Sequence, residues 1–129
     1  MSLGCIFMKY DVAYKLDNNL RREISILNKH INSILLHSEI FLFGSIAKGM
    51  YTKDSDIDLL ILIKENKSLK ELRQMRHFVE DEIEKLELKH EVDIKMYSKD
   101  RYLQLVCEPS FEQAIVKDLI NLKEWNYGT

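Results

Sequence analysis

The chain has 129 residues, of which 46% are hydrophobic and 31% are charged, with one proline and four glycines. This composition is typical of a globular protein, excludes a disordered or fibrous one, and predicts a single domain over residues 1–129. The formal net charge of −2 argues against a broadly basic surface, so nucleic acid is not an expected partner.

The cysteines and the apolar segments predict a soluble, cytoplasmic protein with no membrane association. Cys5 and Cys107 are far apart and match neither a zinc spacing nor a disulfide framework, so we expect reduced, structural thiols. The first ten residues lack the pattern of a signal peptide, and no later window approaches the roughly 20 apolar residues of a membrane span. Met1 and Met8 are both candidates for the natural start.

The first half of the chain predicts a helix followed by a short strand. Apolar residues recur at spacings of three and four between Asp17 and His37, and Asp17 is a suitable N-cap. The apolar face comprises Leu20, Ile24, Leu27, Ile31, Ile34 and Leu35. Residues 39–43 (EIFLF) predict a buried strand that ends at Gly44. One or two helical turns over residues 45–51 and a polar loop over residues 52–55 follow.

Residues 56–63 (DIDLLILI) become continuously apolar, as in a central strand that is covered on both faces. Ser68 and Glu71 have the spacing of a capping box at the start of a helix that we expect to reach about Leu88. Its apolar stripe comprises Leu69, Leu72, Met75, Val79, Ile83 and Leu86. Residues 91–97 (EVDIKMY) alternate strictly and predict a third strand.

The remaining residues predict short helices over 99–106 and from Pro109 to about Leu119, the second burying Phe111, Ile115 and Leu119. The end of the chain fits either a helix or a last short strand. Trp125 and Tyr127 fit an oligomer contact and the core equally well. Together the elements predict an α+β fold, an α/β two-layer arrangement with a small mixed β-sheet and flanking helices.

Asp56 and Asp58 stand two residues apart at the start of the buried strand, so their side chains point to the same side. Two ionised carboxylates held close together repel each other unless a cation lies between them. Oxygen ligands with no nearby His or Cys favour Mg²⁺, or Mn²⁺, over zinc. Because Mg²⁺ usually completes its coordination with water and phosphate oxygens, the pair predicts a phosphate ligand.

Gly44 and Ser45 are the expected phosphate-binding residues. A glycine at a strand end lets the backbone approach a ligand, and the following helix presents free N–H groups to an anion. The Ser45 hydroxyl can add a donor, Gly49 permits the turn into the loop, and we include Ser55 before Asp56 in the same expected site. Lys48 could reach the phosphates, although a solvated surface position explains it equally well.

Asp93 on the third strand would complete a triad of carboxylates if that strand pairs beside the second. Two metal ions held by such a triad could orient a nucleoside triphosphate and stabilise a leaving pyrophosphate. Asp93 would then be the general base that deprotonates an acceptor hydroxyl. The alternative is that Glu91, Asp93 and Lys95 merely form the solvated face of a half-exposed strand.

The segment FGSIAKGMYTKDSDIDLLI, with Asp93 beyond it, resembles the signature of the nucleotidyltransferase superfamily that includes DNA polymerase β. It is most similar to the minimal nucleotidyltransferase branch. The resemblance implies the nucleotidyltransferase fold, with Gly44 and Ser45 holding a triphosphate and Asp56 and Asp58 binding two Mg²⁺ ions. Asp93 would bind the catalytic ion and activate the acceptor.

Members of this branch transfer a nucleoside monophosphate, here expected to be AMP, to a hydroxyl and release pyrophosphate. The branch is often found beside a helical HEPN protein in toxin and antitoxin modules, so a HEPN-family partner, a protein acceptor and a homo- or hetero-oligomer are implied. Relatives often carry arginine after the serine, whereas this chain has Ile46 and Lys48, and lysine loses bidentate phosphate recognition. The alternatives are an antitoxin that neutralises its partner by binding, and a nucleotide-binding module without turnover.

Overall fold

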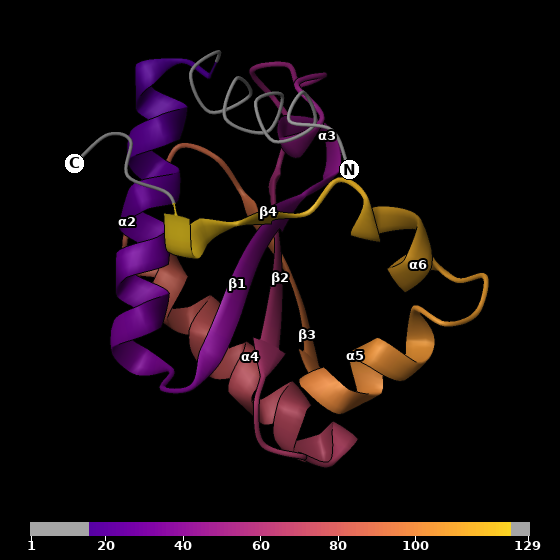
Figure 1. Cartoon of the computed structure of the whole chain (residues 1–129). Coiled ribbons are helices and arrows are strands. Elements are labelled where there is room, and N and C mark those ends of the chain that lie inside the picture. Colours follow the sequence, from indigo (N-terminus) through magenta and orange to yellow (C-terminus); the bar gives the residue numbers. More distant parts are fainter. Residues whose placement is uncertain (1–15, 125–129) are drawn as a thin grey trace.

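The computed structural model describes residues 16–124, which form a four-stranded sheet in the order β3-β2-β1-β4 with helices against it (Figure 1). The strands are β1 (Ser38–Phe43), β2 (Ile57–Ile63), β3 (Val92–Ser98) and β4 (Ile120–Asn121). The helices are α2 (Asn18–Ile34), α3 (Gly44–Ala47), α4 (Leu69–Glu84), α5 (Lys99–Leu105), α6 (Phe111–Val116) and the 3₁₀ turn Leu122–Glu124.

The sheet is mixed, because β1 runs antiparallel to β2 and β4 while β2 and β3 run parallel. Parallel neighbours need a crossover connection, and α4 supplies it between β2 and β3. The expected mixed sheet with flanking helices is therefore confirmed. None of the helices in residues 16–124 is long and apolar enough to cross a membrane.

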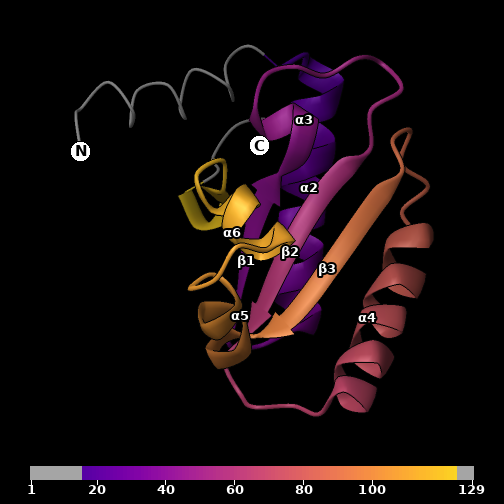
Figure 2. The same cartoon turned by 90° about the vertical axis from the view of Figure 1, so that its right-hand side faces the viewer.

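Helices α2 and α4 pack on one face of the sheet, and α5 and α6 pack on part of the other (Figure 2). Along β2, Ile57, Leu59, Ile61 and Ile63 belong to the α2 and α4 side, whereas Leu60 and Leu62 belong to the opposite side. All six are at most 5% exposed. The prediction of a central strand covered on both faces is confirmed.

The two long helices begin where the sequence predicts and end earlier. The Leu20 N–H donates to Asp17 Oδ1 at 2.8 Å, and Ser68 and Glu71 form a capping box. Helix α2 ends at Ile34 because the chain turns through His37, which has φ 60°. Helix α4 ends at Glu84, before the positive φ of Glu87. The predicted ends near residues 37 and 88 are wrong, since left-handed residues cannot continue a helix.

Two apolar residues that the sequence places in the core are exposed. Leu69 is 77% exposed at the first position of α4, where no element covers it. Phe111 is 49% exposed, and its ring makes an edge-to-face contact with the ring of Phe43, with centroids 6.0 Å apart. Helix α6 has no buried residue and ends at Val116 instead of near Leu119. The first turn of a helix at the protein surface explains both errors.

Other predictions concern the C-terminal segment, the cysteines and the residues at the two ends of the chain. The segment after Leu119 forms the short strand β4 and then a 3₁₀ turn, so the strand alternative is confirmed in part. Cys107 is exposed and therefore does not have the structural role expected of it. Met1, Cys5, Met8, Trp125 and Tyr127 lie outside the described residues.

A buried carboxylate in α2 fixes the segment that leads into β3. Glu23 is 6% exposed and accepts hydrogen bonds from the Lys89 N–H at 2.8 Å and from the His90 N–H at 3.2 Å. Its Oε1 also lies 2.8 Å from His90 Nδ1. Burial works to raise the pKa of Glu23, but these hydrogen bonds outweigh it and the pKa falls below its ordinary value.

We predict that Glu23→Gln lowers the free energy of unfolding at pH 7 by about 1–3 kcal/mol, because one amide oxygen cannot replace two carboxylate oxygens that accept backbone N–H groups. Because the folded pKa is depressed, the loss should be complete above the unfolded pKa and shrink as pH falls through the folded pKa. Urea unfolding between pH 3 and 8 measures this. The exposed Glu65→Gln is the control, and equal effects of the two variants would contradict the prediction.

Candidate active site

The site is built where β2 and β3 begin, side by side. In the parallel register Asp58 stands opposite Asp93, as the sequence predicted for a third strand pairing beside the second. Side chains alternate along a strand, so Asp58 lies on the same face as Leu60 and Leu62. Helices α5 and α6 cover that face farther along the strands. The two carboxylates therefore sit at the uncovered end of the face.

Mutual repulsion and partial burial perturb Asp58. Its pKa is raised to about 6, chiefly by burial and then by the charges of Asp93 and Asp56. Lys95 opposes the shift, and its Nζ lies 3.8 Å from Asp93 Oδ2. Asp56 is exposed and precedes β2 by one residue. Asp56 and Asp93, the other two aspartates that the sequence singled out, therefore both act electrostatically on Asp58.

Three crowded carboxylates have the donor chemistry of a Mg²⁺ or Mn²⁺ site, since hard cations take oxygen ligands and would relieve the repulsion on Asp58. In the part of the chain that the structure describes, however, no three His, Cys, Asp or Glu side chains converge on one point. Asp93 instead faces Lys95. The three carboxylates are chemically suited to such an ion, but their side chains do not converge on one point as the ligands of a bound ion would.

Gly44 brings backbone into contact with Asp58. Its φ is 79°, and a Cβ built on it would lie only 2.1 Å from Asp58 Oδ2 and 3.0 Å from Asp58 Cγ. Only glycine satisfies both conditions, because other residues rarely adopt this φ and any Cβ would displace the carboxylate. The glycine after β1 and the carboxylate at the start of β2 are thus packed directly against each other.

Helix α3 is a single turn after Gly44 and is shorter than the predicted residues 45–51. It ends at Ala47, and Gly49, with φ 75°, closes the turn after the C-cap Lys48. The Gly49 N–H donates to the Ile46 carbonyl at 3.1 Å and the Met50 N–H to the Ser45 carbonyl at 2.9 Å. This pair of hydrogen bonds is a Schellman motif and explains why Gly49 is a glycine. Within residues 16–124 the Ser45 hydroxyl makes no hydrogen bond and remains available as a donor.

Two predicted nucleotide-binding residues make other contacts. Lys48 Nζ lies 3.9 Å from Asp118 Oδ2, between α6 and β4, and the lysine side chain is 51% exposed. The Ser55 Oγ accepts from the Thr52 N–H at 2.9 Å and closes the loop before Asp56. The structure thus places Gly44 and the three aspartates together, while Lys48 faces the C-terminal segment and Ser55 shapes a turn.

Sequence reasoning did not predict the contacts of two charged neighbours of the site. The alternation placed Lys95 on the same face of β3 as Asp93, but only the structure shows its Nζ 3.8 Å from Asp93 Oδ2. Asp118 is 70 residues beyond Lys48, so no local pattern could have indicated that contact.

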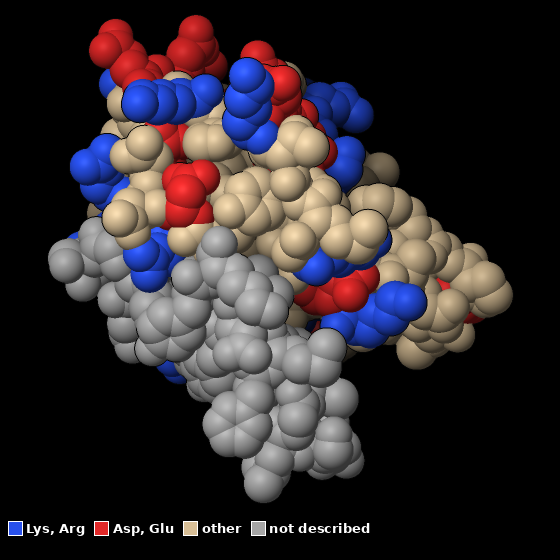
Figure 3. Space-filling view, turned by 90° about the horizontal axis from the view of Figure 1, so that it is seen from above, with Lys and Arg blue, Asp and Glu red and all other residues tan. Residues whose placement is uncertain are grey.

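On the side of the molecule seen in Figure 3, acidic and basic side chains alternate without a large block of either sign.

Comparison with known proteins adds a family match. A family model described as a nucleotidyltransferase domain matches residues 21–123. A Methanocaldococcus jannaschii protein named "Putative protein adenylyltransferase" is 45% identical over 49 residues, which are 36% of this chain and 50% of that protein. The chain therefore spans about half the length of this curated relative.

Two solved structures are similar at a low level. A crystal structure described as a putative nucleotidyltransferase from Sulfolobus solfataricus gives a TM-score of 0.46 at 19% identity, over 84% of this chain and 88% of the other. A crystal structure described as a toxin-antitoxin with AMP-PNP gives a TM-score of 0.45 at 20% identity, over 88% of this chain and 75% of the other. Both similarities are too low to support a conclusion about activity.

We predict that Gly44→Ala destabilises the protein more than Gly49→Ala. Both substitutions force a Cβ onto a left-handed residue, which costs roughly 1–2 kcal/mol. The alanine at position 44 must in addition displace Asp58, whose Oδ2 occupies the position of the new Cβ. Urea unfolding midpoints compare the two variants, and a smaller loss for Gly44→Ala would contradict the contact.

We also predict that Asp58→Asn stabilises the metal-free protein. The folded pKa of about 6 lies above the unfolded value, so the ionised Asp58 destabilises the fold above pH 6 and this penalty disappears as pH falls to 4. The gain at pH 8 should be about 1–2 kcal/mol, less than the full shift because the carboxyl retains contact with water. Urea unfolding in EDTA at pH 4 and 8 measures it. The control is Asp54→Asn, and a gain that does not depend on pH would contradict the assignment.

Proposed function

Because the chain belongs to the nucleotidyltransferase domain family, we propose that it transfers a nucleoside monophosphate, AMP in the first instance, from a triphosphate to a hydroxyl and releases pyrophosphate. The observation that supports this most directly is the register that places Asp58 opposite Asp93, with Gly44 packed against Asp58. A reacting phosphate held there would lie between a backbone turn and a carboxylate cluster.

The turn from β1 into α3 would hold the triphosphate. The N-cap residue Phe43 makes no side-chain hydrogen bond, so the first N–H groups of α3 have no capping partner. The Ser45 hydroxyl and these N–H groups are donors suited to phosphate oxygens. Lys48 could join them only by leaving Asp118, an exchange that its half-exposed side chain allows.

Asp56, Asp58 and Asp93 would hold Mg²⁺, with two ions as the family resemblance implies and Mn²⁺ as a substitute. Bound there, the metal would offset negative charge on the phosphates and on the leaving pyrophosphate. The raised pKa of Asp58 is consistent with this assignment, since burial and then the charges of Asp93 and Asp56 raise it and a bound cation would offset both effects. Small rotations of exposed side chains would bring Asp56 and Asp93 toward Asp58.

Asp93 is the proposed general base. It is about half exposed and lies at the end of the sheet face that α5 and α6 leave open, where an acceptor could approach. The acceptor oxygen would attack the α-phosphorus as Asp93 takes its proton, and the bond to the pyrophosphate oxygen would break. The positive charge of Lys95 lies beside this carboxylate, with Nζ 3.8 Å from Asp93 Oδ2.

We propose that the acceptor hydroxyl belongs to a partner protein. The relative from Methanocaldococcus jannaschii carries a name that states protein adenylyltransferase, which supports this class of acceptor. The open, half-exposed position of Asp93 is compatible with a bulky acceptor. A HEPN-family protein is the first candidate, on the basis of the resemblance of residues 41–63 to the minimal branch.

Asp58→Asn should lower pyrophosphate release from ATP and Mg²⁺ by at least about 100-fold in the presence of the co-purified partner, because it removes a carboxylate from the reacting phosphates. Asp54→Asn is the matched control, since Asp54 is an exposed carboxylate four residues earlier and outside the cluster. Mass spectrometry of the partner would identify the transferred nucleotide. Undiminished turnover in Asp58→Asn would refute the proposal.

Calorimetry with ATP and Mg²⁺ separates the remaining alternatives. Binding without pyrophosphate release would favour a nucleotide-binding module. If Asp58→Asn bound neither nucleotide nor metal and still neutralised a co-expressed partner in full, an antitoxin that acts by binding would be favoured instead.

A further inference from the structure

Strand β3 forms an edge of the sheet. Among residues 16–124 it pairs with β2 alone. The Ile57 N–H donates to the Glu91 carbonyl at 2.8 Å, and Ile57 stands opposite Val92 in the register. In a parallel pair this geometry turns the N–H and C=O groups of every second residue, Val92, Ile94 and Met96, away from β2. An unpaired edge of this kind is a template for another strand.

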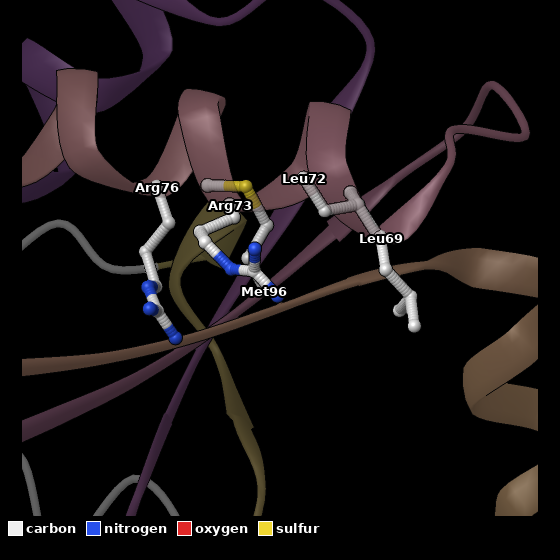
Figure 4. A pocket seen from close by; sticks show the side chains of 5 residues that line it. All are labelled: Leu69, Leu72, Arg73, Arg76 and Met96. Carbon is white, nitrogen blue, oxygen red and sulfur yellow. The ribbon is translucent and has the colours of Figure 1, made fainter.

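Helix α4 runs along this edge, and the space between them is hollowed in two places. One cavity of about 180 Å³ is lined by Leu69, Leu72, Arg73, Arg76 and Met96, and Figure 4 shows both arginines reaching from α4 toward β3. The other, of about 390 Å³, lies between Glu80, Glu84 and Glu87 of the α4 end and Val92 and Ile94 of β3. We call these two cavities, together with the edge of β3 from Val92 to Met96 that runs past them, the β3 edge groove.

The β3 edge groove is basic at one end and acidic at the other. Within the described residues, Arg73 and Arg76 make no ion pair, and the buried Nε of Arg76 has no hydrogen-bond partner. At the acidic end Glu84 and Glu87 likewise lack a basic partner, and Glu80 lies 3.4 Å from His77. The described residues thus leave unpaired charge of one sign at each end of the groove, a pattern that a partner with the opposite arrangement of charges would complement.

We propose that the β3 edge groove binds a second copy of this chain, with two β3 strands paired antiparallel about a two-fold axis near Ile94. The charge pattern is self-complementary under that rotation, which is the requirement for an isologous interface. Arg76 would face Glu80 of the partner subunit, and Arg73 would face Glu84 of the partner subunit. The residue numbers of the first pair and those of the second add up to nearly the same value. One antiparallel register of the two α4 helices can therefore form both ion pairs.

The same register suits the strands. Val92 of one copy would meet Met96 of the partner subunit, and Ile94 would meet its own counterpart, so that the outward backbone groups pair across the axis. The side chains of Val92, Ile94 and Met96 point to the α4 side. Asp58 and Asp93 lie on the opposite face of the sheet, so the dimer would leave the proposed active site open.

Reciprocal charge reversal tests this proposal. Sedimentation velocity over a range of protein concentrations should show a reversible dimer of the wild type. Arg73→Glu/Arg76→Glu should raise the dissociation constant at least tenfold, because glutamates then face glutamates at both ends. Glu80→Arg/Glu84→Arg should do the same with arginines. A mixture of the two variants should regain dimers, since the two altered grooves are complementary to each other.

The control is Arg101→Glu/Lys117→Glu, which changes the net charge as Arg73→Glu/Arg76→Glu does, on exposed residues in α5 and at the C-cap of α6 away from the groove, and should dimerise like the wild type. Circular dichroism establishes that each variant is folded. A wild type that remains monomeric at all concentrations would overturn the proposal and indicate a different protein partner for this edge. Dimers that survive both reversals, or a mixture that stays monomeric, would also overturn it. None of these outcomes depends on nucleotidyl transfer.

Discussion

The parallel pairing of β2 with β3 is the constraint on which the site depends, because it alone sets Asp93 beside Asp58. Burial of the Asp58 carboxylate, and then the neighbouring charges of Asp93 and Asp56, oppose folding when it is ionised, and both raise its pKa. The apolar run from Leu59 to Ile63 behind Asp58 is almost fully buried, and each such side chain contributes roughly 1.5–3 kcal/mol. A strand whose remaining residues are buried on both faces can therefore tolerate an unfavourable carboxylate near its first residue.

Patterns that repeat along the chain predicted much of the fold. The 3.6-residue period identified α2 and α4, the caps at Asp17 and Ser68 fixed their starts, and the alternation over residues 91–97 identified β3. The candidate site was predictable for the same reason, since Gly44 and the DxD segment stand at strand ends where the type of residue is chemically informative. The resemblance to a known family added the role of Asp93, which its own strand pattern left open.

The rest depended on contacts between distant segments. The sequence pattern did not single out Glu23 of α2, which is buried because the chain returns to it 66 residues later. Phe111 reads as core, but α6 covers only part of the sheet and leaves its first residue exposed. Helix ends were misplaced because His37 and Glu87 adopt left-handed conformations for which their residue types give no clear signal.

Glu23 also fixes the position of β3 relative to β2, and therefore of Asp93 relative to Asp58. Its carboxylate holds the Lys89 and His90 N–H groups, and the next carbonyl, that of Glu91, accepts from Ile57 at the start of β2. A slip of one residue there would send Asp93 to the opposite face of the sheet. Until residues 89 and 90 are held by Glu23 and β3 pairs with β2, the site thus has two of its three carboxylates, Asp56 and Asp58, and the third depends on a contact made on the opposite side of the sheet from the site.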